Sequence, residues 1–251
     1  MRAITDPESV QTLQPEWPAP ARVRAAFTLR QGGVSQAPYD SLNVGAHVGD
    51  EPAAVAENRR RLRVQLQLSH EPAWIEQVHG TEVLDLDGPG ATGAADAVFT
   101  RRSGPVCAVQ VADCLPVLMS VRDGSAVAAA HAGWRGLAAG VLEATVKRLS
   151  VEPSQLIAWL GPAIGQAHFE VGEEVRQAFL AHDAGATVAF TANARGRWQC
   201  DLAGLARGRL VALGVGAIFG GDWCTYADAS RFFSYRRDGR CGRMAALIWR
   251  E

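Results

Sequence analysis

A predicted hairpin constrains the fold of this chain more than any other feature. Residues 106–111 and 117–121 are short, mostly apolar runs typical of buried strands. After them, Asp123–Gly124 is a strong turn signal, and the apolar return strand that follows delivers His131. Paired antiparallel strands lie about 5 Å apart. The hairpin alone therefore predicts that Cys114 and His131, although distant in sequence, lie at the same end of two neighbouring strands.

The remaining periodicities predict a mixed arrangement of strands and helices. We expect strands over residues 22–29, 73–77, 82–86, 156–160, 215–219 and 245–249, and helices over residues 51–66, 136–149, 172–181 and 201–213. Asp50 is expected to cap the first helix, with Pro52 in its first turn. Strands and helices alternate without a regular βαβ rhythm, which predicts an α/β or α+β fold with mixed β-sheets. Residues 1–21, interrupted by prolines, are predicted to form an irregular lead-in to a single catalytic domain over residues 22–251.

Composition excludes several classes of protein. The chain has 251 residues, a net charge of -1 and 5 cysteines. With this net charge, the protein has no overall positive electrostatic field that would attract nucleic acid or an anionic membrane. The odd cysteine number and the absence of a CxxC pair argue against a disulfide framework, and no apolar run is long enough for a membrane span. We expect a cytoplasmic protein with reduced thiols, no nucleic-acid or membrane partner, and a monomeric or small homo-oligomeric state.

Three short motifs each place one metal-binding side chain where a predicted strand ends. They are Gln77–Gly80, Ala112–Pro116 and His131–Gly136, which supply His79, Cys114 and His131. Each side chain alone has an ordinary structural explanation, for example a small core cysteine. Together they match a catalytic zinc, which uses three protein ligands and keeps its fourth position open, whereas structural zinc uses four. Copper could substitute for zinc at such a site.

Two neighbours of these ligands are candidate functional residues, each with a structural alternative. Asp113 could orient a ligating histidine through a hydrogen bond, or could bond its own backbone in a turn. Arg135 precedes the predicted helix at residue 136 and could bind an anion at the helix start, or could be a solvated surface arginine. Residues 32–33 and 161–165 are glycine-containing loops that match neither a P-loop nor a dinucleotide-binding fingerprint.

The motifs QVHG, ADCLPV and HAGWRG together resemble the YfiH/LACC1 family, also called the laccase-domain or multicopper polyphenol oxidoreductase family. Further segments resemble the motifs of this family in the same order: 27–35, 41–50, 57–62, 161–165 and 232–248. Two positions depart from its common pattern, namely Cys241, where threonine is commoner, and His168, where cysteine is commoner. Neither departure touches the three proposed ligands.

The resemblance implies a CNF1/YfiH-like fold and a catalytic zinc held by His79, Cys114 and His131. It also implies a small-molecule enzyme that cleaves adenosine, inosine, guanosine or methylthioadenosine with phosphate and deaminates adenosine. The candidate catalytic residues are Cys114, His131 and Asp113. The candidate residues for binding nucleoside or phosphate are Arg135, Arg30, Asn43 and His47.

Other functions stay open from the sequence alone. Some bacterial members of the family are described as amidases that edit peptidoglycan precursors, and Cys114 with a histidine base could hydrolyse a substrate without metal. A binding protein with an incidental metal is a further alternative. A copper-dependent polyphenol oxidase is disfavoured, because a four-copper laccase needs many histidines. This chain has 6, and none are arranged as an HxH pair.

Overall fold

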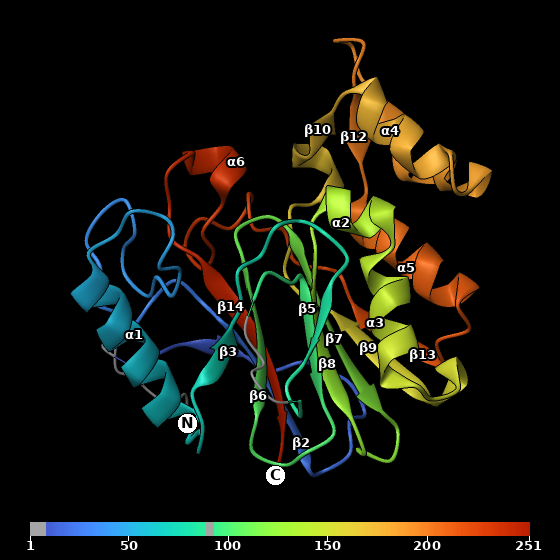
Figure 1. Cartoon of the computed structure of the whole chain (residues 1–251). Helices are drawn as coiled ribbons and strands as arrows, with labels where there is room; N and C mark the ends of the chain where they lie inside the picture. Colours follow the sequence, from blue (N-terminus) through green and yellow to red (C-terminus); the bar gives the residue numbers. More distant parts are fainter. Residues whose placement is uncertain (1–8, 89–92) are drawn as a thin grey trace, which may run out of the picture.

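The computed structural model describes residues 9–88 and 93–251, and its centre is two β-sheets packed face to face (Figure 1). The strand order of the first sheet is β1 (Thr12–Leu13), β2 (Val23–Thr28), β14 (Met244–Arg250), β6 (Val106–Val111) and β3 (Pro72–Trp74). The strand order of the second is β13 (Ala217–Gly220), β9 (Leu156–Leu160), β7 (Leu115–Val121), β8 (Val127–Ala132), β5 (Ala97–Thr100) and β4 (Val83–Asp85). Both contain parallel and antiparallel pairs, which confirms the prediction of mixed sheets.

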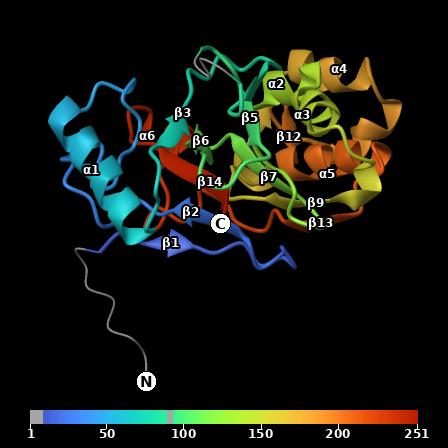
Figure 2. The same cartoon turned by 60° about the horizontal axis from the view of Figure 1, so that its bottom comes forward.

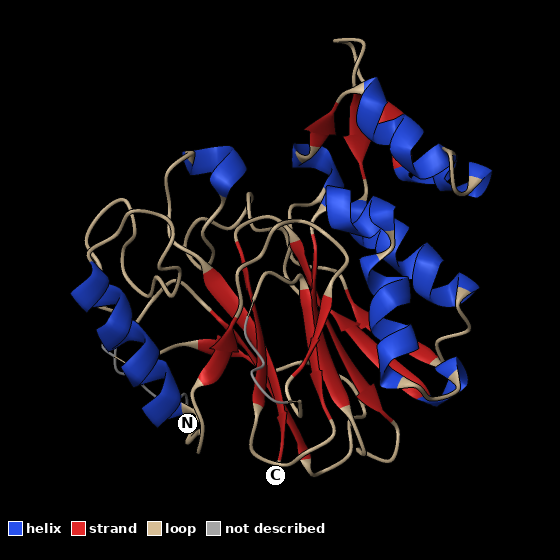
Figure 3. Ribbon diagram, viewed as in Figure 1, coloured by secondary structure: helices blue, strands red, loops and turns tan. Residues whose placement is uncertain are grey.

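Helices cover the outer faces of both sheets, so the fold has four layers (Figure 3). Against the first sheet lies α1 (Pro52–Gln65), and against the second lie α2 (Trp134–Ala139), α3 (Val141–Leu149) and α5 (Leu202–Ala212). Beyond these layers are α4 (Glu173–Leu180), α6 (Tyr235–Asp238), and a three-stranded sheet of β10 (Glu170–Val171), β12 (Trp198–Cys200) and β11 (Phe190–Ala192). Figure 2 shows α1 and the α2–α5 group on opposite sides of the molecule.

The alternation of side chains along β8 fixes which way His131 points. Val127 and Ala129 pack into the core between the two sheets, whereas Ala128 and Ala130 pack against the outer helices. His131 is in phase with the first pair, because side chains alternate between the faces of a strand. A shift of one residue in register would turn the imidazole toward the helices.

The link between the two sheets lies beside this histidine. β6 belongs to the first sheet and β7 to the second, so Ala112, Asp113 and Cys114 form the crossover from one sheet to the other. Pairing of Leu115 with Ala132 confirms the predicted hairpin and brings the crossover to the end of β8. The metal-ligand motifs therefore gather at one edge of the two-sheet sandwich, at the top of Figure 1.

Several local predictions were wrong. The single helix expected over residues 136–149 is two helices, separated at Gly140, whose φ of 103° is readily adopted only by glycine. Asp50 does not cap α1; Glu51 is the N-cap residue and provides no side-chain cap. The carboxylate of Asp50 instead accepts hydrogen bonds from Ser35 and Asn43.

The predicted lead-in is only partly irregular, and some elements were not anticipated. Residues 1–8 of the lead-in lie outside the described residues, but β1 adds residues 12–13 to the first sheet. Neither β5 nor the three-stranded sheet was predicted from the sequence. In the described part of the chain, no helix combines the length and apolarity needed to cross a membrane.

Candidate metal centre

His79, Cys114 and His131 come together at the shared edge of the two sheets. Their ligand atoms all lie within 4.8 Å of one another. His79 lies in the loop after β3, Cys114 in the crossover between β6 and β7, and His131 near the end of β8. His79 is exposed and His131 is buried, so the cluster has one side open to solvent and one side inside the protein.

The donor set and its spacing fit a zinc ion. The Sγ atom of Cys114 lies 3.8 Å from Nε2 of His79. Tetrahedral zinc with ordinary Zn–S and Zn–N bond lengths places two such ligand atoms about 3.5 Å apart. Two imidazoles and one thiolate therefore need only a small adjustment to hold the ion. Three protein ligands leave a further position for substrate.

Asp96 holds two of the three ligands and is fully buried. Its carboxylate accepts hydrogen bonds from the backbone N–H groups of Val78, His79 and Gly80, at 3.2, 2.9 and 2.6 Å. Nδ1 of His131 lies 2.8 Å from the same carboxylate. The backbone of His131 also donates to the carbonyl of Asp96. One side chain thus ties the loop that carries one ligand to the strand that carries another.

The charge of Asp96 determines which nitrogen of His131 faces the metal position. Burial would raise the pKa of the Asp96 carboxyl group, but hydrogen bonds from His131, Gly80 and His79 hold it below its ordinary value. An ionised carboxylate only accepts hydrogen bonds, so Nδ1 of His131 must be the donor. When His131 is neutral, the lone pair of Nε2 therefore faces the metal position.

Cys114 has the character of a ligand or nucleophile rather than of a core thiol. Burial raises the pKa of Cys107, and it raises the pKa of Cys200 to about 12. At Cys114 burial acts in the same direction, but the charge of His131 and hydrogen bonds from His131 and His79 lower the pKa to about 6. The thiolate is therefore the main form at neutral pH, as metal binding and nucleophilic attack both require.

Within the described residues, the hydrogen bonds of the structure join the carboxylate of Asp113 to groups other than a histidine. Its carboxylate accepts hydrogen bonds from the hydroxyl group of Thr225 at 2.6 Å and from the backbone N–H of Arg236 at 2.7 Å. The carboxylate beside His131 is Asp96, which sequence reasoning missed. Asp113 has a φ of 90°, a left-handed conformation that aspartate tolerates better than most residues. Its bonds attach the chain next to Cys114 to the C-terminal segment.

The start of α2 packs directly against the ligands. A Cβ atom at Gly133, the N-cap residue, would lie 2.8 Å from a ring carbon of His79 and 3.0 Å from Sγ of Cys114. Only glycine allows this approach. Arg135 follows two residues later, exposed, with its guanidinium 4.4 Å from the ring centre of Trp134. The predicted anion-binding arginine therefore stacks on Trp134 and lies two residues from the glycine that contacts the proposed ligands.

The other three candidate binding residues have different surroundings from one another. The guanidinium of Arg30 donates hydrogen bonds to Asp40 and to the carbonyl of Ala229. Asn43 is fully buried, and its side-chain amide is hydrogen-bonded on both the nitrogen and the oxygen. His47 is exposed. Across residues 9–88 and 93–251, no hydrogen bond or ion pair joins these three residues to the metal ligands.

We expect Asp96→Asn to lower metal affinity about 10- to 100-fold, the usual cost of losing a partner that orients a metal-bound histidine. The amide removes the negative charge and one acceptor, so both the His131 ring and the loop around His79 lose their support. Titration against a competing chelator measures the change. Exposed Asp222, replaced by asparagine, is the matched control. Equal metal affinity in the two variants would contradict this role for Asp96.

Comparisons with known proteins identify the family of this chain. The family model described as "Multi-copper polyphenol oxidoreductase laccase" matches residues 24–251. A Pseudomonas aeruginosa protein named purine nucleoside phosphorylase is 57% identical over 238 residues, covering 94% of this chain and 97% of that protein. Its Escherichia coli counterpart, named purine nucleoside phosphorylase YfiH, is 56% identical with the same coverage.

Solved structures extend the similarity to the fold. A Neisseria meningitidis protein superposes with a TM-score of 0.92 at 48% identity, covering 96% of this chain and 99% of that chain. YfiH of Bacillus licheniformis superposes with a TM-score of 0.90 at 31% identity, covering 98% of each chain. The chain therefore belongs to the YfiH family of laccase-domain proteins, as its ligand motifs indicated.

Proposed function

We propose that this protein is a zinc-dependent purine nucleoside phosphorylase. The observation that carries the proposal is the His79–Cys114–His131 cluster supported by Asp96. The names of relatives more than half identical to the chain point to the same reaction. We extend the proposal to adenosine, inosine, guanosine and methylthioadenosine as substrates, and to deamination of adenosine, as the family resemblance implies.

Phosphorolysis sets clear demands on the residues around the substrate. A phosphate oxygen forms a bond to the anomeric carbon of the ribose while the bond from that carbon to the purine nitrogen breaks. The phosphate is an anion and the departing purine gains electrons, so both need positive partners. A bound zinc would supply Lewis-acid stabilisation of negative charge. In this proposal Arg135, beside the ligands, binds the phosphate.

The remaining residues act by holding the site in shape. Asp96 keeps His131 in one tautomer, and Asp113 joins the chain beside Cys114 to Thr225 and Arg236. We assign Asp113 a positioning role, because both carboxylate oxygens accept hydrogen bonds within the protein. Arg30, Asn43 and His47 remain proposed contributors to nucleoside or phosphate binding in this chain.

The purified protein is expected to contain about one zinc per chain. Cys114→Ala and His131→Ala should reduce the zinc content to near zero, because two ligands do not retain a catalytic zinc. Elemental analysis after gel filtration measures the stoichiometry. His182→Ala removes an exposed histidine that is not among the proposed ligands, so it should leave the zinc content unchanged. Stoichiometric zinc in the Cys114 variant would show that the ligands are misassigned.

With adenosine and phosphate, the protein should release adenine and ribose 1-phosphate; without phosphate, adenine release should stop while some inosine forms. Arg135→Ala should raise the KM for phosphate about tenfold, since a charge-assisted contact is lost, and should affect deamination less. Chromatography of the products measures both reactions. Arg102→Ala removes another exposed arginine as a control. Phosphate-independent adenine release would contradict phosphorolysis, and equal losses in both reactions would deny Arg135 this role.

A metal-independent cysteine hydrolase, such as an amidase for peptidoglycan precursors, is the second candidate. The specific observation in its favour is the lowered pKa of Cys114 beside His131. Removal of metal by a strong chelator distinguishes the two functions. The zinc phosphorylase should lose nucleoside turnover and regain it when zinc is returned. A cysteine hydrolase should keep its activity after chelation and lose it only after alkylation of the thiol.

The protein is not expected to behave as a four-copper laccase. A blue-copper site adds a weak axial ligand to its two histidines and one cysteine. Met119, the nearest methionine in sequence, is fully buried and packs into the core on the helix-covered side of its sheet, away from the face of His131. Added copper should give weak phenol oxidation, no stable blue chromophore and reduced nucleoside turnover. An intense blue band with several coppers per chain would overturn this expectation.

A further inference from the structure

A hollow lies along α1 and contains none of the proposed metal ligands. Its volume is about 330 Å³, the size of pockets that bind small molecules. Most of the residues that line the hollow belong to α1 and recur at helical spacing. They are Pro52, Val55, Ala56, Arg59, Arg60 and Arg63. Ala46 and Glu71 complete the lining. Three arginines and one carboxylate give this lining an excess of positive charge.

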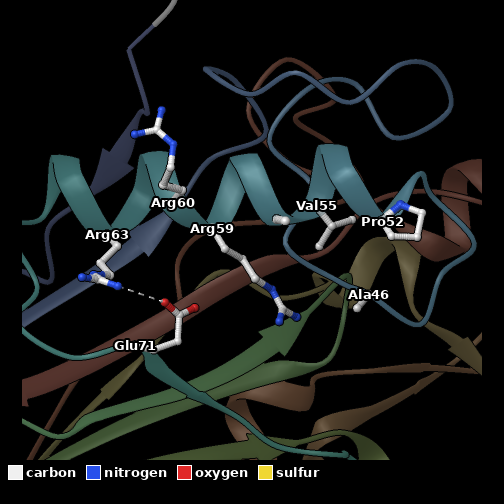
Figure 4. Close-up of a pocket in the computed structure, with 8 residues that line it drawn as sticks. Ala46, Pro52, Val55, Arg59, Arg60, Arg63 and Glu71 are labelled. Atoms are coloured by element: carbon white, nitrogen blue, oxygen red, sulfur yellow. Dashed lines mark ion pairs between the residues drawn. The ribbon is translucent and has the colours of Figure 1, made fainter.

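Arg59 is the most unusual member of this group. Its Nε atom donates a hydrogen bond of 2.9 Å to the carbonyl of Val44, and its guanidinium stacks 4.4 Å from the ring centre of Trp74. These two contacts fix the plane of the guanidinium. Within residues 9–88 and 93–251, its two Nη atoms have no hydrogen-bond or ion-pair partner. Figure 4 shows the group extending from α1 toward Ala46.

Within the described residues, no carboxylate forms an ion pair with Arg59, although the charge of Glu71 raises its pKa. One oxygen of Glu71 accepts a hydrogen bond from Trp74 at 2.7 Å, and the other lies 3.9 Å from Arg63. Arg60 is already paired with a carboxylate of its own helix, Glu57, at 2.7 Å. Figure 4 shows Arg59 and Arg63 on the same side of α1 as Glu71, with Arg60 pointing away from it.

The surroundings of Arg59 add to the positive potential. Burial lowers the pKa of Arg59 itself. Burial and the charges of Arg243 and Arg59 lower the pKa of His47. The charge of Glu71 partly offsets the effect of burial on Arg59, but the two side chains form no ion pair within the described residues. A bound anion would therefore stabilise this partly buried cation further. The fixed Nη atoms of Arg59 match two oxygens of a phosphate group.

We infer that the hollow along α1 is a binding site for a small phosphate monoester, distinct from the metal centre. The phosphate group accepts hydrogen bonds from the free Nη atoms of Arg59 and pairs electrostatically with Arg63. The hollow is larger than a phosphate ion needs, and the apolar walls of Ala46, Pro52 and Val55 receive the carbon skeleton. The proposed ligand is therefore a phosphorylated sugar-sized molecule rather than inorganic phosphate alone. This inference does not depend on the proposed phosphorylase activity.

Calorimetric titration in phosphate-free, low-salt buffer tests the site, with ribose 5-phosphate, inorganic phosphate and ribose as probes. Ribose 5-phosphate should bind with one site per chain and more tightly than inorganic phosphate, whereas ribose alone should give no binding. Arg59→Gln should weaken ribose 5-phosphate about tenfold or more, because charged hydrogen bonds are lost. Ala56→Glu should do the same without removing any contact, since it adds a carboxylate at an exposed helical position lining the hollow.

Two further variants serve as controls. Arg102→Gln removes one positive charge from another surface, and Cys114→Ser disables the metal centre; both should bind ribose 5-phosphate as the unmodified protein does. Absence of binding to the unmodified protein, or unchanged affinity in Arg59→Gln and Ala56→Glu, would overturn the inference. Loss of binding in Cys114→Ser with retention in Arg59→Gln would assign the phosphate to the metal centre instead. Failure of nucleoside turnover would leave the binding result unaffected.

Discussion

The buried carboxylate of Asp96 is the interaction on which the candidate metal centre depends. Four hydrogen bonds end on it, three from the backbone of residues 78–80 and one from His131. Removing an ionised carboxylate from water is costly unless its oxygens are satisfied by such donors. The same bonds hold His79 at a φ of 61°, a conformation that most residues avoid. The site is therefore stable only as a unit, in which loop, strand and carboxylate support one another.

The two-sheet architecture explains why these groups meet at one edge. The chain leaves the first sheet after β6 and enters the second at β7, so Cys114 lies where the sheets are joined. His131 belongs to the second sheet, whereas His79 follows a strand of the first. The ligands thus bridge two sheets whose common core lies directly beneath them. A metal bound here would link the two sheets in addition to taking part in catalysis. The geometry of its ligands would then depend on how the two sheets pack against each other.

The parts of the fold that depend on local pattern were predictable, and the parts that depend on long-range contacts were not. The run 106–111 and the Asp123–Gly124 turn predicted the strand and hairpin that the structure contains, because alternation and turn chemistry are local properties. Asp96 could not be found in this way, since its partners are distant in sequence and no metal motif includes it. Its one available signal was a lone aspartate before the short apolar run at 97–100. The break at Gly140 was likewise hidden, because a periodic apolar pattern continues across it.

Opposite charges distinguish the two proposed sites and would lead them to select different ligands. At the metal centre, the thiolate of Cys114 and the carboxylate of Asp96 concentrate negative charge that a cation balances, whether a proton on His131 or a metal ion. Along α1, Glu71 offsets the charge of the fixed guanidinium of Arg59 only in part, and in our proposal a bound anion balances the rest. At physiological ionic strength, salt largely screens interactions between solvent-exposed charges more than about 8 Å apart. The exposed charges of each site therefore act mainly on groups close to them. In these two proposals, one fold therefore presents a cation site at the edge of its sheets and an anion site along α1.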